Sequence, residues 1–270
     1  MEKETILITV KTYPNISSKY TELVCTAGFR SDGSWIRIYP VPYRLLSDDK
    51  QFKKYSYIRV PIHKNPSDTR PESYKITNSE EIEILHTIDT KNYWRKRKDI
   101  VFKNKVYTNM RELIKDAQEK NLVSLATFKP TEIVSFNSEK NGNEQWSTEE
   151  LRNFKNANNS LFSDIDLSNM PKIPYSFKIH FKDDAGNNSK MTILDWEFLQ
   201  LYLNYRYKKK QSMEISKNKV IEQLKSFYET KDLYFFLGTT NRFHHWSSNP
   251  FTIIGIFYPK KENFYTPSLF

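Results

Sequence analysis

The sequence predicts a β-rich α+β fold built on small β-barrels or sandwiches. Short strand patterns recur at roughly ten-residue spacing through the first hundred residues, as is typical of such folds. Helical patterns are confined to the middle and the last third of the chain. The chain also has 18 Phe and 17 Tyr but only 6 Gly, which favours an aromatic core and disfavours a glycine-rich nucleotide-binding fold.

The N-terminal strands are expected at residues 4–13, 22–29, 34–44 and 55–63, where apolar residues alternate with polar ones or form short runs. The Ser31-Asp32-Gly33 turn predicts a hairpin between the second and third of these strands.

The rest of the chain mixes helices and strands. A helix capped by Thr108 is expected over 108–121, strand character over 122–136, and a capping box at Ser147 and Glu150. A hairpin over 173–194 precedes a helix that begins at Asp195 and a second helix capped by Ser216. Two apolar strands, 232–240 and 250–258, follow.

Composition narrows the functional classes. Forty-two basic residues against 32 acidic ones give a net charge of +10, which favours a polyanionic partner such as nucleic acid, although lysine-rich composition alone can produce it. Cys25 is the single cysteine, so no disulfide or thiolate cluster can form within the chain, and we expect it to be buried and unreactive. No targeting or membrane-spanning pattern occurs, so we expect a cytoplasmic protein with no membrane partner.

Two strands divide their residues by face, because neighbours two apart share a side. Trp35, Arg37 and Tyr39 oppose Ile36 and Ile38 in the first strand. In the second, Tyr57 and Arg59 oppose Ile58 and Val60. We expect the aliphatic residues to be buried and both Arg side chains to lie on a partly open face, where the rings stack bases and Arg contacts phosphates. The alternative is that the rings pack under a helix while Arg extends to water.

Further basic residues extend this predicted surface. Lys53, Lys54 and Arg70 flank the second strand and suit phosphate contacts. In the segment Arg242–Trp246, the residues Arg242, His244 and Trp246 are candidates for binding a phosphate or a base, with a loop of ordinary polar residues as the alternative. The densest basic run, Trp94–Lys105, has Trp94 and Phe102 as candidate stacking residues. A solvated helix start explains this run better than a contact site does.

A catalytic site is less well supported. A metal-dependent nuclease or nucleotide-processing enzyme would use Mg²⁺ with Asp183, Asp184, Asp195 and Glu197, which are close in sequence. The spacing of Asp195 and Glu197 does not match a nuclease motif, and Asp195 is better explained as a helix cap. No P-loop, zinc-protease or nucleophile-elbow motif is present.

Several segments together resemble a bacterial family described as a dual OB-containing domain: "KTYPNISSKYTELVCTAG", "WIRIYPVPYR", "DTRPESYKI", "ILDWEFLQLY", "FFLGT" and "FTIIGIFYP". They are spread over nearly the whole chain. The resemblance implies two OB-like barrels with helices between and beside them. We accordingly expect an N-terminal barrel over 1–105, a connection over 106–165 that starts the second barrel, and a C-terminal barrel with two helices over 166–270.

These observations favour a binding protein over an enzyme. We expect it to bind single-stranded DNA or RNA through the Trp35–Tyr57 face without a cofactor, as an accessory to a defence, repair or RNA-processing system. The alternatives are the metal-dependent enzyme and a protein-interaction module that docks a partner on its aromatic face.

Overall fold

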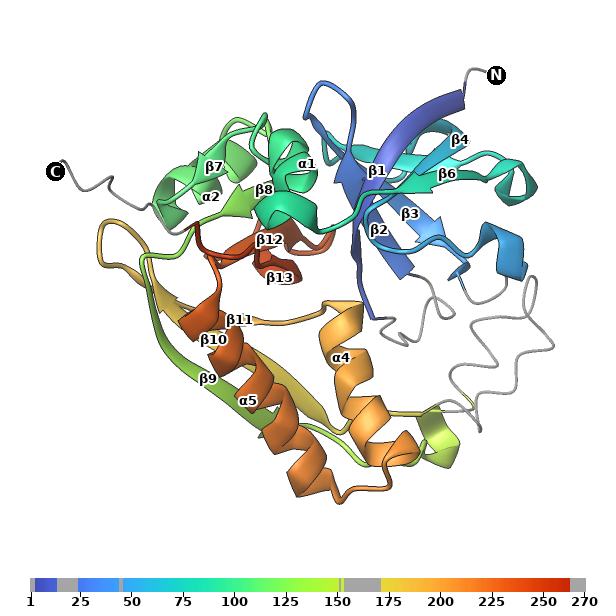
Figure 1. Cartoon of the computed structure of the whole chain (residues 1–270). Helices are drawn as coiled ribbons and strands as arrows, with labels where there is room; N and C mark the ends of the chain where they lie inside the picture. Colours follow the sequence, from blue (N-terminus) through green and yellow to red (C-terminus); the bar gives the residue numbers. More distant parts are fainter. Residues whose placement is uncertain (1–2, 14–23, 44–45, 151, 153–170, 263–270) are drawn as a thin grey trace, which may run out of the picture.

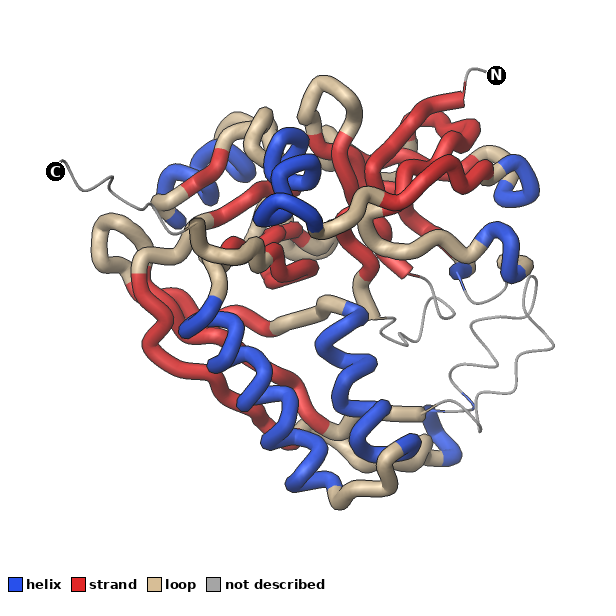
Figure 2. The backbone as a smooth tube through the Cα atoms, in the orientation of Figure 1, coloured by secondary structure: helices blue, strands red, loops and turns tan. Residues whose placement is uncertain are grey.

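The chain folds as a β-rich α+β protein, as predicted, in a computed structural model that describes residues 3–13, 24–43, 46–150, 152 and 171–262. The N-terminal half forms a β-barrel, and two further sheets with most of the helical residues follow it (Figures 1 and 2).

Five N-terminal strands close the barrel. Their order is β1-β2-β3-β5-β4, and β4 pairs back onto β1. All neighbours are antiparallel except β3 and β5, which run parallel with Arg37 opposite Ser73. A sixth strand, β6, adds to β4 outside the closed ring. The strands are β1 (Lys3–Lys11), β2 (Val24–Phe29), β3 (Trp35–Val41), β4 (Ser56–Lys64), β5 (Ser73–Ile76) and β6 (Glu83–Thr87).

The barrel interior confirms the predicted aliphatic faces. Ile36, Ile38, Ile58 and Val60 are all buried in one core cluster, together with Ile6 and Ile8 of β1. The turn before β3 forms the predicted hairpin, with Phe29 of β2 paired to Trp35.

The outer face of the barrel is also buried along β1, β2 and β3. Leu7, Phe29 and Trp35 belong to a second cluster that includes Phe236 and Phe257 from the end of the chain. The Trp35 ring lies 5.2 Å from that of Phe236 in an edge-on arrangement. The barrel and the second half of the chain therefore share a core.

The second half contains two sheets. The four-stranded sheet has the order β13-β12-β8-β7, and the three-stranded sheet has the order β11-β10-β9. A bridge between Ile193 and Ile253 joins them. Among the described strands no ladder closes these sheets into a second barrel. Their strands are β7 (Val106–Tyr107), β8 (Leu125–Phe128), β9 (Glu132–Lys140), β10 (Tyr175–Lys182), β11 (Asn188–Thr192), β12 (Tyr234–Thr239) and β13 (Phe251–Phe257).

The helices begin at polar caps. Asp195 caps its helix as predicted, by accepting a hydrogen bond from the Glu197 amide. The caps predicted at Thr108 and Ser216 were wrong, because Asn109 and Ser212 accept the first amide hydrogen bonds instead. The helices are α1 (Lys91–Val101), α2 (Met110–Gln118), α4 (Trp196–Leu203), which continues into the π-helix η5 (Asn204–Lys208), and α5 (Met213–Thr230).

Helices α4 and α5 pack on each other and cover part of the shared hydrophobic core of the second half (Figure 1). In the part of the chain that the structure describes, every helix is too short or too polar to cross a lipid bilayer.

Cys25 departs from the expectation of full burial. Its neighbours Val24 and Thr26 are fully buried, and strand alternation places Cys25 on the other face, where it is partly exposed. Whether the thiol reacts stays a prediction.

Candidate nucleic-acid interface

The predicted Trp35–Arg37 face is not an open surface. Trp35 and Arg37 do lie opposite Ile36 and Ile38, as alternation requires, but Trp35 is buried and Arg37 is only 1% exposed. The prediction that Arg37 faces solvent was wrong because the second half of the chain packs on this side of β3. Tyr39, further along the strand, is half-buried.

Arg37 is held by neutral groups. It donates to the Ser124 hydroxyl (2.6 Å), the Ser124 carbonyl (3.1 Å) and more weakly to the Thr239 carbonyl and the Ser73 hydroxyl. Burial, and next the charge of Arg70, lower the pKa of the Arg37 guanidinium below its ordinary value. Arg37 therefore links β3 to the second half of the chain.

Two other predicted phosphate ligands are buried in ion pairs. Arg70 pairs with Asp68 at 2.5 Å and also donates to the Thr239 carbonyl. Lys54 pairs with Asp195 at 2.9 Å and Glu197 at 3.2 Å. Burial disfavours the charged ammonium of Lys54, but these carboxylates outweigh it and raise the pKa. Both basic groups are thus neutralised within the fold, whereas Lys53 is exposed.

The remaining predicted residues, Tyr57 and Arg59, lie on the outer surface of β4 beside β6. Arg59 is exposed, as expected, and lies 3.6 Å from Glu83. Tyr57 is half-buried, and its ring centre lies 4.9 Å from that of exposed His86, its partner across the β4–β6 ladder. An aromatic pair and a cation therefore stand on one side of this ladder.

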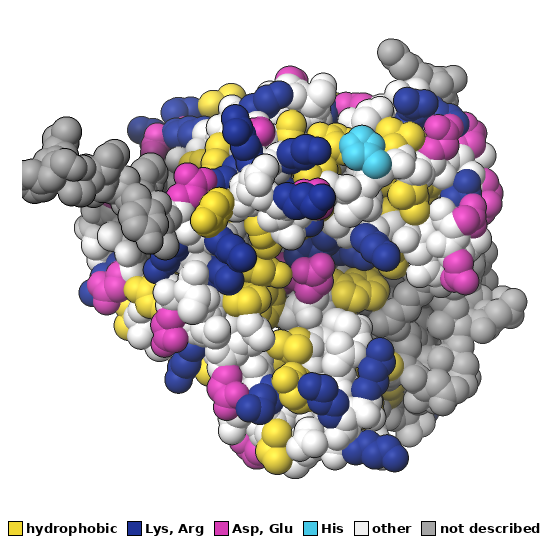
Figure 3. Space-filling model, in the orientation of Figure 1, with side chains coloured by type: hydrophobic (Ala, Val, Ile, Leu, Met, Phe, Trp, Pro, Cys, Tyr) yellow, Lys and Arg dark blue, Asp and Glu magenta, His cyan; other side chains and the backbone are white. Residues whose placement is uncertain are grey.

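Helix α1 follows β6 directly and is strongly basic on its exposed side. Lys91, Arg95 and Lys96 are exposed and form no ion pair with any described residue. Figure 3 shows the Lys and Arg side chains gathered around α1. Among the described residues, nothing neutralises these cations, which therefore suit an anionic ligand.

The start of α1 has an unusual backbone. Asn92, Tyr93 and Trp94 have φ values of 48°, 54° and 65°, in the left-handed region that disfavours side chains with a Cβ. The turn directs Trp94 into the core and leaves Tyr93 49% exposed beside the free cations. Arg97 of the same helix is buried next to this turn. Its guanidinium lies 3.7 Å from the Tyr55 ring centre and donates to the Ile88 carbonyl.

We call the surface formed by these two elements the basic face. It consists of Tyr57, Arg59 and His86 from β4 and β6, and Lys91, Tyr93, Arg95 and Lys96 from α1. The two parts adjoin, because Tyr57 packs against the cluster that contains Ile88 and Trp94.

The predicted residues Arg242 and His244 have different positions. Arg242 is exposed on the loop between β12 and β13, whereas His244 is fully buried. The His244 ring bonds to the Thr239 hydroxyl (3.0 Å) and the Asn121 side chain (3.1 Å). Burial, followed by the charges of His245, Arg70 and Arg37, lowers its pKa to about 4. His244 therefore anchors the loop and does not itself face a ligand.

The four candidate metal-binding carboxylates have structural partners. Asp183 is buried in the β10–β11 turn and accepts from the Met110 and Asn187 amides. Asp184 accepts from Thr108 and Asn109, while Asp195 and Glu197 hold Lys54. Within the described ranges, no three His, Cys, Asp or Glu residues gather as metal ligands. This arrangement does not favour the enzyme alternative.

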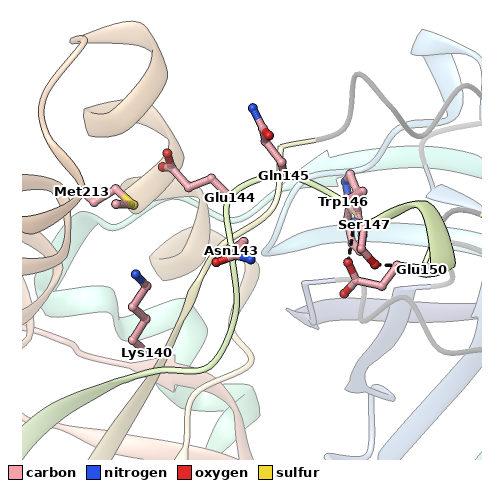
Figure 4. Close-up of a pocket in the computed structure, with 8 residues that line it drawn as sticks. All are labelled: Lys140, Asn143, Glu144, Gln145, Trp146, Ser147, Glu150 and Met213. Carbon is pink, nitrogen blue, oxygen red and sulfur yellow. Dashed lines mark hydrogen bonds between the residues drawn. The ribbon is translucent and has the colours of Figure 1, made fainter.

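A pocket of about 410 Å³ lies between the end of β9 and the start of α5 (Figure 4). Its carboxylates are paired: Glu144 with Arg206 at 2.6 Å, and Glu150 with Lys172 at 2.5 Å. Ser147 and Glu150 form the predicted capping box there. The pocket therefore offers no carboxylate to a cationic ligand. It is lined by Lys140, Asn143, Glu144, Gln145, Trp146, Ser147, Glu150 and Met213.

Sequence reasoning missed most of the α1 part of the basic face. The basic run was recognisable, but one of its two candidate stacking rings was wrong, because Trp94 is buried. Phe102 is 37% exposed, and its ring centre lies 5.0 Å from that of Tyr234. Tyr93, the exposed ring, directly precedes that run. No helical periodicity could identify it, because the backbone is left-handed there.

Comparison with known proteins divides the chain in two. Residues 2–103 match a family described as Domain of unknown function (DUF8758), and residues 106–270 match one described as Domain of unknown function (DUF8757). A search of curated proteins found no match.

Proposed function

This chain belongs to the family described as Domain of unknown function (DUF8757), and we propose that it binds single-stranded nucleic acid through the basic face. The observation that carries the proposal is the set of exposed cations on α1, Lys91, Arg95 and Lys96, which pair with no acidic residue in the described part of the chain and lie beside exposed Tyr93. Phosphates meet the cations, and unpaired bases stack on the rings of Tyr93, Tyr57 and His86.

The barrel topology also supports this proposal. We infer an OB-like barrel, a fold that often holds oligonucleotides, from the closed ring of five strands in the order β1-β2-β3-β5-β4. The usual ligand face of such a barrel, on its second and third strands, is covered here by the second half of the chain. The ligand then contacts the neighbouring β4–β6 ladder and α1. A fold alone does not establish a function, so the side chains carry the argument.

The salt dependence of binding tests the proposal. Four cations on the basic face, each neutralising one phosphate, give a slope of log affinity against log salt of about −3 for a single strand. Arg95→Ala with Lys96→Ala should make that slope shallower by about 1.4. Fluorescence anisotropy with labelled single-stranded DNA and RNA at several salt concentrations measures both values.

Lys217→Ala with Lys219→Ala is the matched control, because it removes two charges from α5 and none from the basic face. It should leave the slope unchanged. Absence of binding at low salt, or equal slopes for the two double variants, would contradict the proposal.

A further inference from the structure

The loop between β12 and β13 exposes large aromatic side chains. Trp246 is 85% exposed and Phe243 is 49% exposed. Leu122, on the turn between α2 and β8, is 60% exposed. Soluble proteins rarely leave a tryptophan this open without a partner, because its burial would stabilise the fold.

Hydrogen bonds anchor the loop that carries Trp246. His244 of the same loop is fully buried and bonded on both ring nitrogens. Gln118 of α2 donates to the carbonyls of His244 (3.1 Å) and Ser247 (2.7 Å). The loop is therefore fixed on both sides of Trp246, which reduces the ordering cost of binding.

The hydrogen bonds that anchor this loop extend into the barrel. Arg37 and Arg70, both buried, donate to the Thr239 carbonyl at the start of the loop. Asp68 is held by Arg70 and the Ser73 hydroxyl. The acidic groups below the loop are thus occupied, and they do not oppose an anionic ligand above it.

The loop between β12 and β13 is basic, which favours an anionic partner. Between Thr239 and Phe251 the sequence contains no Asp or Glu, while Arg242 and His245 are exposed. The Arg242 guanidinium lies 5.3 Å from the Phe243 ring centre. An aromatic ring beside an arginine, without a carboxylate, fits a planar base carried by an anionic backbone.

We propose that the Arg242–Trp246 loop is a second contact for single-stranded nucleic acid, in which unpaired bases stack on Trp246 and Phe243 while Arg242 meets a phosphate. This inference rests on the proposed function but uses a different element of the fold, so it can fail alone. Stacking releases no counterions, and Trp246 should therefore contribute affinity without changing the salt slope.

Tryptophan fluorescence tests the stacking directly, because Trp246 is far more exposed than the buried Trp35 and Trp94. Titration with a 20-nucleotide oligothymidylate should quench the wild-type emission. Trp246→Phe should lose most of that quenching, whereas Trp146→Phe, the matched control, should retain it. By anisotropy, Trp246→Ala should weaken binding about tenfold, with an unchanged salt slope.

The outcomes separate this inference from the proposed function. If the oligonucleotide binds with the expected slope but Trp246→Phe is quenched like the wild type, the loop proposal is overturned and the basic face stands. If no oligonucleotide binds at low salt, the proposed function is overturned. The loop proposal is then tested separately, by whether millimolar thymidine monophosphate quenches the tryptophan emission of the wild type. Failure of the monophosphate to quench the wild type, or a blue shift with anionic vesicles alone, overturns the loop proposal.

Discussion

At the scale of single residues, His244 shows how a histidine can be structural without being charged. Its ring has a hydrogen-bond partner on each nitrogen, one of them the Thr239 hydroxyl and the other the Asn121 side chain. Burial lowers the pKa of His244 most, the charges of His245, Arg70 and Arg37 lower it further, and the charge of Asp68 opposes them. Protonation would place a further charge in this buried, already cationic region.

We expect this histidine to make stability depend on pH. Its pKa is about 4 in the fold, below its ordinary value near 6.5, so the unfolded state binds the proton more readily. The contribution is complete above about pH 6.5 and is lost as the pH falls towards 4. Urea unfolding at pH 7.5, 6.5, 5.5 and 4.5 should show this loss.

His244→Gln should unfold more easily than the wild type at pH 7.5 but lose less stability between pH 6.5 and 4.5. His63→Gln, which alters an exposed histidine on β4, serves as the control and should follow the wild type. A wild-type protein whose stability is flat between pH 6.5 and 4.5 would show that His244 does not titrate in this way.

At the scale of elements, α1 combines backbone strain with a ligand surface. Each left-handed non-glycine residue costs about 1–2 kcal/mol relative to the right-handed region. The Tyr93 ring gains little packing in return, because it is half exposed. Strain kept at an exposed aromatic residue is consistent with a binding role.

Substitution of Tyr93 can separate the strain from the contact. Tyr93→Gly should raise the free energy of unfolding by about 0.5–1 kcal/mol relative to Tyr93→Ala, since glycine accepts a positive φ. Both variants should bind oligonucleotide more weakly, by about 1–3 kcal/mol, because both lose the ring. Chemical denaturation and anisotropy measure the two effects. A glycine variant less stable than the alanine variant would mean that the turn is not left-handed in solution.

The elements also show what sequence patterns can determine. Alternation correctly divided β3 and β4 into faces, since Ile36, Ile38, Ile58 and Val60 are all buried. Alternation could not tell that Arg37 is covered, because the groups that cover it come from Ser124 and Thr239, far along the chain. Likewise, a local pattern identified Arg59 as exposed but could not show that Lys54 pairs with Asp195. Burial by distant segments is the information that a local pattern lacks.

At the scale of the whole molecule, the two halves are joined by a common core. Trp35 and Phe29 of the barrel pack against Phe236 of β12. Arg37 donates to Ser124, which directly precedes β8, and to Thr239 at the end of β12. Neither half could bury these groups alone. We therefore expect the chain to unfold in one transition.

Arg37→Ala tests this coupling. It removes four hydrogen bonds and a large buried side chain, and we expect it to lower the free energy of unfolding by about 3 kcal/mol. Tryptophan fluorescence and far-ultraviolet circular dichroism should still give coincident curves. Arg59→Ala, on the open face, should change stability by less than about 0.5 kcal/mol. Two separated transitions in the wild type would contradict the shared core.

The contact of Arg37 with the second half also constrains how such genes can recombine. The family boundary at residues 103 and 106 suggests two exchangeable modules, yet the residues that bond Arg37 lie beyond it, at Ser124 and Thr239. A chimera that joins the first module of one relative to the second module of another must carry a matched set at these positions. We therefore expect a mismatched exchange to leave the buried Arg37 guanidinium without its acceptors and to destabilise the chimera.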